Sequence, residues 1–149
     1  MPRHILVMLD TYGRSERLLV RVRLLARHFH STVSLLMVST PEREPASSLA
    51  QPAAACDRHT QQYLHEVATR LLQEGIEVCM IVRCGEPVET VLTVAQEVGA
   101  DIIAMTMPWR TGAALSEAQN ITEQVIRRAP LPVLVERPYG GTVRSKRSM

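Results

Sequence analysis

The sequence predicts an α/β fold in which a parallel sheet is covered by helices on both faces. Five short segments are apolar almost throughout, without the polar alternation of a half-exposed strand, and they span residues 4–9, 33–38, 76–82, 101–107 and 132–136. Strands of this kind are buried on both faces. Apolar residues recur at helical spacing in the segments between these strands. Such alternation of strands and helices is typical of a parallel sheet.

The first half of the chain holds two of the predicted helices. The first strand ends at Asp10, and the helix that starts near Ser15 carries Leu18 and Val22 on one side and arginines on the other. The Pro-containing segment Ser39–Ala55 is expected to form a loop. The second helix is expected from about Asp57 to Gln73, followed by Gly75 as a terminating glycine.

The second half repeats the pattern. The turn Gly85-Glu86-Pro87 places proline where the first turn of a helix tolerates it, and Gly99 is expected to end that helix. The stretch from Pro108 to Ser116 is expected to be a loop. The fourth helix follows it with three apolar residues facing inward, Ile121, Val125 and Ile126.

Composition limits the classes of function. The 149 residues suit one domain, expected over 1–137, and the 3% of aromatic residues disfavour base-stacking modules. The net charge is +2, but Arg144, Lys146 and Arg147 belong to residues 138–149, which are expected to form a disordered basic tail. Without this tail the domain has one negative charge in excess, so its bulk charge does not predict nucleic-acid binding. No apolar run approaches the roughly 18 residues of a membrane span.

The number and spacing of the cysteines indicate that they are reduced thiols. Cys56, Cys79 and Cys84 are odd in number and contain no CxxC pair, which favours neither a zinc site nor a disulfide framework. The apolar run Ile5–Leu9 is too short for the core of a signal peptide. We therefore expect a cytoplasmic protein.

Candidate functional residues lie where the strands end, because ligands of open parallel sheets bind outside the carboxyl ends of the strands. Asp10 either contacts a ligand there, through a base, a ribose or a magnesium ion, or caps the first helix, and the sequence favours both equally. No GxGxxG, P-loop or GxSxG motif is present, and no paired carboxylates are expected at the strand ends beside Asp10. The sequence thus predicts no catalytic site and no metal site.

Three segments together resemble the universal stress protein family over nearly the whole chain. They are ILVMLD near the start, GEPVETVLTVAQEVGADIIAMT in the middle and RRAPLPVLVER near the end. The resemblance implies a Rossmann-like, adenine-nucleotide alpha-hydrolase-like fold with a five-stranded parallel sheet in the order 3-2-1-4-5. It also implies a homodimer formed through the last strand, where Val133 and Val135 lie.

The same resemblance bears on nucleotide binding. One branch of the family binds ATP through a G-x2-G-x9-G-[ST] motif, whose glycine positions here hold Thr106, Trp109 and Gln119, with Asn120 at the hydroxyl position. Glycines let backbone N–H groups approach phosphates closely, so standard ATP binding is not expected. Gln119 and Asn120 would still let the fourth helix offer its positive N-terminus to an anion.

Three pocket positions do match the family, namely Asp10, Val38 and Gly85. The leading hypothesis is a non-catalytic stress-response module that acts as a homodimer through contacts with an unknown protein partner, without a cofactor. The alternative is a sensor that binds ATP, AMP or another adenine compound in an altered cleft. An enzymatic interpretation, nucleotide hydrolysis or adenylyl transfer, lacks a phosphate loop and a base.

Overall fold

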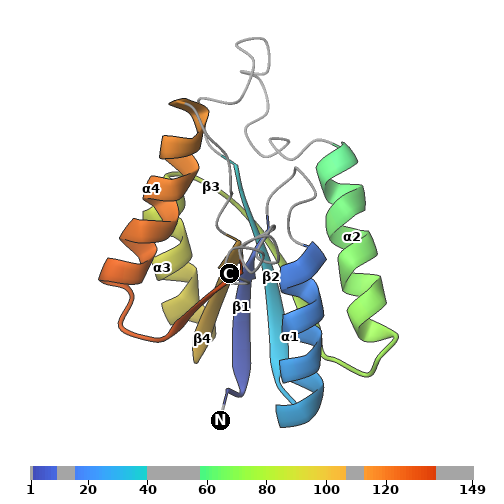
Figure 1. Ribbon diagram of the computed structural model, residues 1–149. Helices are drawn as coiled ribbons and strands as arrows, with labels where there is room; N and C mark the ends of the chain where they lie inside the picture. The colour runs from blue at the N-terminus through green and yellow to red at the C-terminus, as the bar shows by residue number, and fades with distance from the viewer. Residues whose placement is uncertain (1, 10–15, 40–57, 107–112, 137–149) are drawn as a thin grey trace, which may run out of the picture.

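The computed structural model describes residues 2–9, 16–39, 58–106 and 113–136, and within these ranges strands and helices alternate (Figure 1). The elements in chain order are β1 (His4–Met8), α1 (Glu16–Phe29), β2 (Thr32–Ser39), α2 (Arg58–Leu72), β3 (Val78–Cys84), α3 (Pro87–Val98), β4 (Ile102–Thr106), α4 (Ala113–Arg128) and β5 (Val133–Glu136).

The five strands form one parallel sheet in the order β3-β2-β1-β4-β5, which confirms the predicted fold class and strand order. Helices α1 and α2 cover one face of the sheet, and α3 and α4 cover the other (Figure 1). Strand β1 is central, because Ile5 pairs with Val33 of β2 on one side and with Ile102 of β4 on the other.

Alternate residues of β1 divide the core into two clusters. Ile5 and Val7 pack toward α1 and α2, whereas Leu6 packs toward α3 and α4, and all three side chains are fully buried. Burial of each such side chain stabilises the fold by about 2 kcal/mol. A strand with helices on both sides is apolar at nearly every position, which is why its sequence shows no polar alternation.

Strand β3 corrects one prediction. The apolar run at residues 76–82 predicts a strand buried on both faces, but the strand is Val78–Cys84 and most of its residues are exposed. Met80 is 51% exposed and Val82 is 41% exposed. The physical reason is topological: β3 pairs with β2 alone among the described strands, and the helices cover the centre of the sheet more fully than this border.

Helix α4 corrects another. It begins at Ala113, inside the stretch predicted to be a loop, because Ala113, Ala114 and Leu115 are strong helix formers. Val125 is fully buried as predicted, but Ile126 is 47% exposed. Adjacent helix residues lie about 100° apart around the axis, so both cannot face the sheet equally.

The helix ends follow the predicted chemistry. Pro87 occupies the first turn of α3, and Gly99 ends that helix in the left-handed conformation with φ of 68°. Among the described helices, none is long and apolar enough to cross a bilayer.

Candidate functional site

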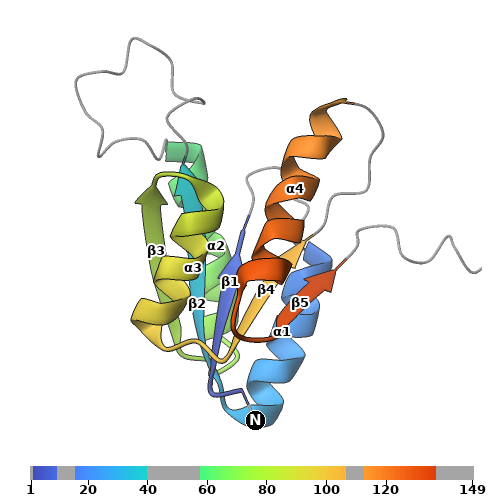
Figure 2. The same cartoon turned by 90° about the vertical axis from the view of Figure 1, so that its left-hand side faces the viewer.

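The carboxyl ends of the parallel strands meet at one edge of the sheet, shown at the top of Figure 2, and this edge holds the candidate site. Val38, Gly85 and Thr106 lie there within the described residues. Asp10, Trp109 and the rest of residues 107–112 fall outside the described ranges, as does the 138–149 tail.

Val38 and Gly85 are brought together from neighbouring strands. Val38 is the penultimate residue of β2, pairs with Arg83 of β3 and is half-buried against the cluster under α3 and α4. The N–H of Gly85 donates to the carbonyl of Ser39 at 2.9 Å, which extends the β2–β3 ladder beyond the end of the strand. Two of the three pocket positions therefore sit beside each other at this edge.

The turn that follows Gly85 closes the N-terminus of α3. The Glu86 carboxylate accepts hydrogen bonds from the N–H of Glu89 at 2.8 Å and from the N–H of Val88 at 3.2 Å. These are N–H groups of the first helical turn, where an anion would otherwise bind. Helix α3 thus carries its own carboxylate at the position that a phosphate would take.

The turn at Gly85 favours glycine, because of its backbone conformation and the close approach of Thr90. Its φ is +157°, a backbone conformation that residues with a side chain rarely adopt, and an added Cβ would lie 3.1 Å from Oγ1 of Thr90. The turn between β3 and α3 is therefore tightly packed against the first turns of the helix.

Thr106, at the end of β4, holds an unsatisfied polar atom. Its Oγ1 is buried and has no hydrogen-bond partner among the described residues. Thr106 pairs in register with Glu136 of β5, whose Oε1 accepts a hydrogen bond from Nε of Arg21 on α1 at 2.7 Å. A buried hydroxyl without a partner costs free energy, so this atom is available to a bound molecule or water.

The Arg21–Glu136 ion pair was not predicted, because the two residues are separated by 115 positions and no local pattern links them. Its carboxylate side chain is only 13% exposed, while the arginine is 63% exposed. The pair holds α1 against the end of β5, next to Thr106.

Helix α4 does not place Gln119 and Asn120 at its N-terminus, where the sequence left room for an anion. These residues lie in the second turn of a helix that begins at Ala113. Only the first four N–H groups of a helix lack an intrahelical partner, so the N–H groups of both residues belong to the helical hydrogen-bond ladder. The positive end of α4 lies instead at Ala113.

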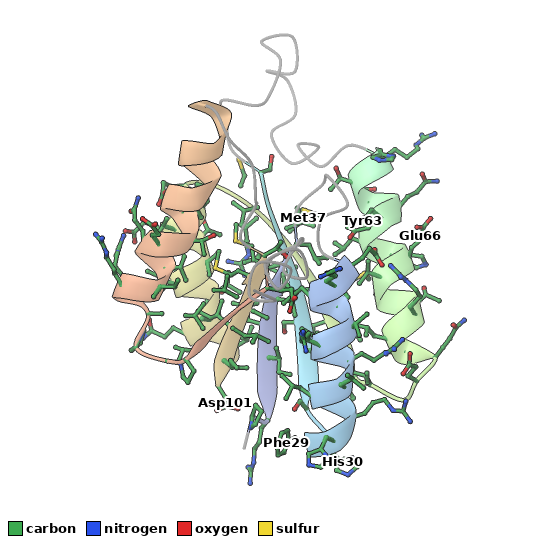
Figure 3. The ribbon with its side chains drawn as sticks, in the orientation of Figure 1. Phe29, His30, Met37, Tyr63, Glu66 and Asp101 are labelled. Carbon is green, nitrogen blue, oxygen red and sulfur yellow. The ribbon has the colours of Figure 1, made fainter. Side chains whose placement is uncertain are left out.

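The clearest electrostatic perturbations lie at the opposite, amino edge, where Asp101 is labelled in Figure 3. Oδ2 of Asp101 accepts from the N–H of Arg3 at 2.7 Å and of His4 at 2.9 Å, and these hydrogen bonds lower the pKa of its carboxyl group. Burial lowers the pKa of His4, whose Nε2 lies 2.7 Å from Oγ of the fully buried Ser34. This network ties the start of the chain to β2 and β4 and is structural.

No metal centre is formed by the part of the chain that the structure describes, because it contains no group of three or more His, Cys, Asp or Glu side chains placed so that they could hold a metal ion.

A hollow of about 170 Å³ lies between α1 and α2. It is lined by Leu19 and Val67 and bordered by the ion pair of Arg70 with Glu16. The hydrogen bonds that the Arg70 guanidinium donates to the Glu16 carboxylate raise the pKa of Arg70.

Fold and site together define a class of protein. It is an α/β protein whose candidate ligand site lies at the carboxyl ends of its strands, and its described residues form no recognisable set of catalytic side chains. The profile of the universal stress protein family matches residues 1–137. The chain belongs to the universal stress protein family.

Solved structures share the fold. Hypothetical protein MJ0577 has a TM-score of 0.77 at 24% identity, with 91% of this chain and 95% of that one covered. A universal stress protein in complex with cAMP has a TM-score of 0.67 at 19% identity, covering 92% and 98%. A universal stress protein from Archaeoglobus fulgidus has a TM-score of 0.65 at 22% identity, covering 91% of this chain but 44% of that one. A search of curated proteins returns no match.

Proposed function

We propose that this chain is a non-catalytic universal stress protein module that works as a homodimer through protein contacts, with a nucleotide loop that no longer cradles phosphates. The observation that carries the proposal is the start of α4 at Ala113. The helix covers the motif positions Gln119 and Asn120, so the backbone there is committed to helical hydrogen bonds rather than to a phosphate.

Two further features support the loss of a phosphate site. Thr106 stands at the first glycine position, where a side chain hinders close approach of a phosphate to the backbone. Glu86 caps α3 with a negative charge, which repels a phosphate from the neighbouring helix N-terminus.

The homodimer is proposed through β5, the border strand that carries Val133 and Val135. Both side chains are half-buried, and an apolar border strand gains by pairing with another strand. Replacement of both valines by lysine is expected to yield a monomer in sedimentation experiments, with circular dichroism to show that the variant is folded. An unchanged dimer would place the interface elsewhere.

A second candidate function is favoured by one specific observation, the buried Oγ1 of Thr106, which has no hydrogen-bond partner in the part of the chain that the structure describes. A family member binds cAMP, and a hydroxyl at the end of β4 could hydrogen-bond an adenine compound in an altered cleft beside Val38 and Gly85. In this case the ligand would be recognised without the phosphate loop.

The experiment that separates the two functions measures nucleotide in gently purified protein, followed by titration calorimetry with Mg-ATP, AMP, cAMP and adenosine. The first proposal predicts no co-purified nucleotide and no heat of binding. Binding that Thr106→Val weakens at least 10-fold, while the protein's melting temperature stays within a few degrees, supports the adenine sensor instead. Turnover of any nucleotide contradicts both. The cAMP-binding family member serves as the positive control for the assay.

A further inference from the structure

Within residues 2–9, 16–39, 58–106 and 113–136, strand β3 forms a border of the sheet that lacks the usual protection (Figure 2). Natural proteins blunt such edges with short strands, proline, bulges or exposed charges. β3 is seven residues long and contains no proline. Its one charged residue, Arg83, is neutralised by Glu97 of α3 at 3.0 Å. By contrast, β5 has four residues, preceded directly by Pro132.

The exposed side chains of this border are apolar. Met80 and Val82 are 51% and 41% exposed, which places them among the most exposed large apolar residues of the described chain. They share one face with Val78, which packs against the cluster under α1 and α2, because alternate strand residues point to the same side. Ile81 points to the opposite face, where it contacts the cluster under α3 and α4.

The hydrogen bonds between β2 and β3 show which backbone groups of β3 have no partner among the described strands. Val33 of β2 donates its N–H to the carbonyl of Glu77, and Gly85 donates its N–H to the carbonyl of Ser39, both at 2.9 Å. In a parallel pair every second residue turns both backbone groups toward its neighbour, so the odd-numbered residues of β3 face β2. The even-numbered ones therefore point their N–H and C=O groups away from the sheet, and they are Val78, Met80, Val82 and Cys84.

This border is complementary to itself. We propose that β3 pairs antiparallel with β3 of a second copy of the chain, about a two-fold axis that is perpendicular to the sheet and passes midway between Ile81 and Ile81 of the second copy. In this register the whole strand Val78–Cys84 is paired, and every outward residue meets an outward residue of the second copy.

The side chains match in the same register. Met80 lies directly opposite Val82 of the second copy on the α2 face, so the two exposed apolar residues cover each other twice. On the α3 face Ile81 meets its own copy. No like charges face each other, because Arg83 lies opposite Cys79. The pairing joins two five-stranded sheets and places the two α2 helices on one face and the two α3 helices on the other.

This interface is separate from the one proposed for β5 and does not rest on it. The two edges lie on opposite sides of the sheet, so an assembly that uses both would be larger than a dimer. Each interface can be removed without touching the other, which makes their tests independent.

Cysteine cross-linking tests the register with exposed positions only. In a chain carrying Cys56→Ser, Cys79→Ser and Cys84→Ser, one sample also carries Met80→Cys and a mass tag, and another carries Val82→Cys. Directly opposed hydrogen-bonded residues have Cα atoms about 5.5 Å apart, which a short bifunctional thiol reagent spans. Identical positions are offset by two residues along the strand, which separates them by roughly 8 Å.

We expect the mixed sample to form the cross-linked pair at least 10-fold faster than either sample alone. The same preference should persist when Val133 and Val135 are both lysine, since β5 is not involved. Equal cross-linking in all samples, preferential cross-linking of identical positions, or no cross-linking above that of a Thr93→Cys control on α3 would overturn the proposal. Sedimentation adds a readout without cysteines: Val82→Lys should weaken self-association through β3 at least 10-fold.

Discussion

Replacement of Gly85 by alanine tests the tight turn at the candidate site. The added Cβ would lie 3.1 Å from Oγ1 of Thr90, a distance that requires one of the two groups to shift by a few tenths of an ångström. The φ of +157° adds backbone strain for any residue with a side chain, on the order of 1–3 kcal/mol. The close contact adds about 1 kcal/mol. We therefore expect Gly85→Ala to lower the free energy of unfolding by about 2–4 kcal/mol.

The contact is separated from the backbone strain by a double-mutant cycle with Thr90→Ala. Urea unfolding followed by circular dichroism measures all four proteins, with a linear extrapolation to water. Alanine at position 85 should lower the free energy of unfolding by about 0.5–1 kcal/mol less when residue 90 is alanine than when it is threonine. A Gly85→Ala variant as stable as the parent would refute the strain argument. A cost that is the same in both backgrounds would refute the contact with Thr90.

Three further outcomes are expected. The pKa values of Asp101 and His4 are lower in the folded protein than in the unfolded chain, so the unfolded chain binds more protons as the pH falls. The free energy of unfolding should therefore rise with pH. In thermal melts the melting temperature should fall as the pH drops below 6.5, because of His4, and again below 3.8, because of Asp101. Asp101→Asn should remove the fall below pH 3.8, and a variant with the same pH profile as the parent would contradict this assignment. Glu86→Ala should cost about 1 kcal/mol by uncapping α3, measured in urea, and an anion should then stabilise the variant more than the parent. Glu136→Gln should cost at most about 1 kcal/mol, because Arg21 is largely exposed; a larger loss in urea would mean that Thr106 or β5 depends on this carboxylate.

The sequence predicted the strands β1, β2 and β4 because each is apolar almost throughout, a pattern typical of burial on both faces. Pro87 and Gly99 marked the ends of α3 through chemistry that acts within a few residues. The strand order came from the resemblance to the family, because no local pattern records which strands become neighbours.

The candidate site could be predicted only in part. The positions Val38 and Gly85 were found from family strings and do lie together at the carboxyl edge. The expected start of the fourth helix was wrong, because helix propensity at residues 113–115 starts α4 inside the predicted loop and leaves Gln119 in its second turn. The ion pair of Arg21 with Glu136 had no sequence signal, since the residues meet only after the sheet has formed.

What the sequence determined by itself is the set of elements and the class of fold, because hydrophobic periodicity and helix-end residues act over short distances. The tertiary structure decided which apolar strand lies inside and which at the border. β1 and β3 have similar runs of apolar residues, yet β1 is buried between two strands while Met80 and Val82 of β3 are exposed. Burial depends on what packs against a strand, and the neighbours of a strand come from distant parts of the chain.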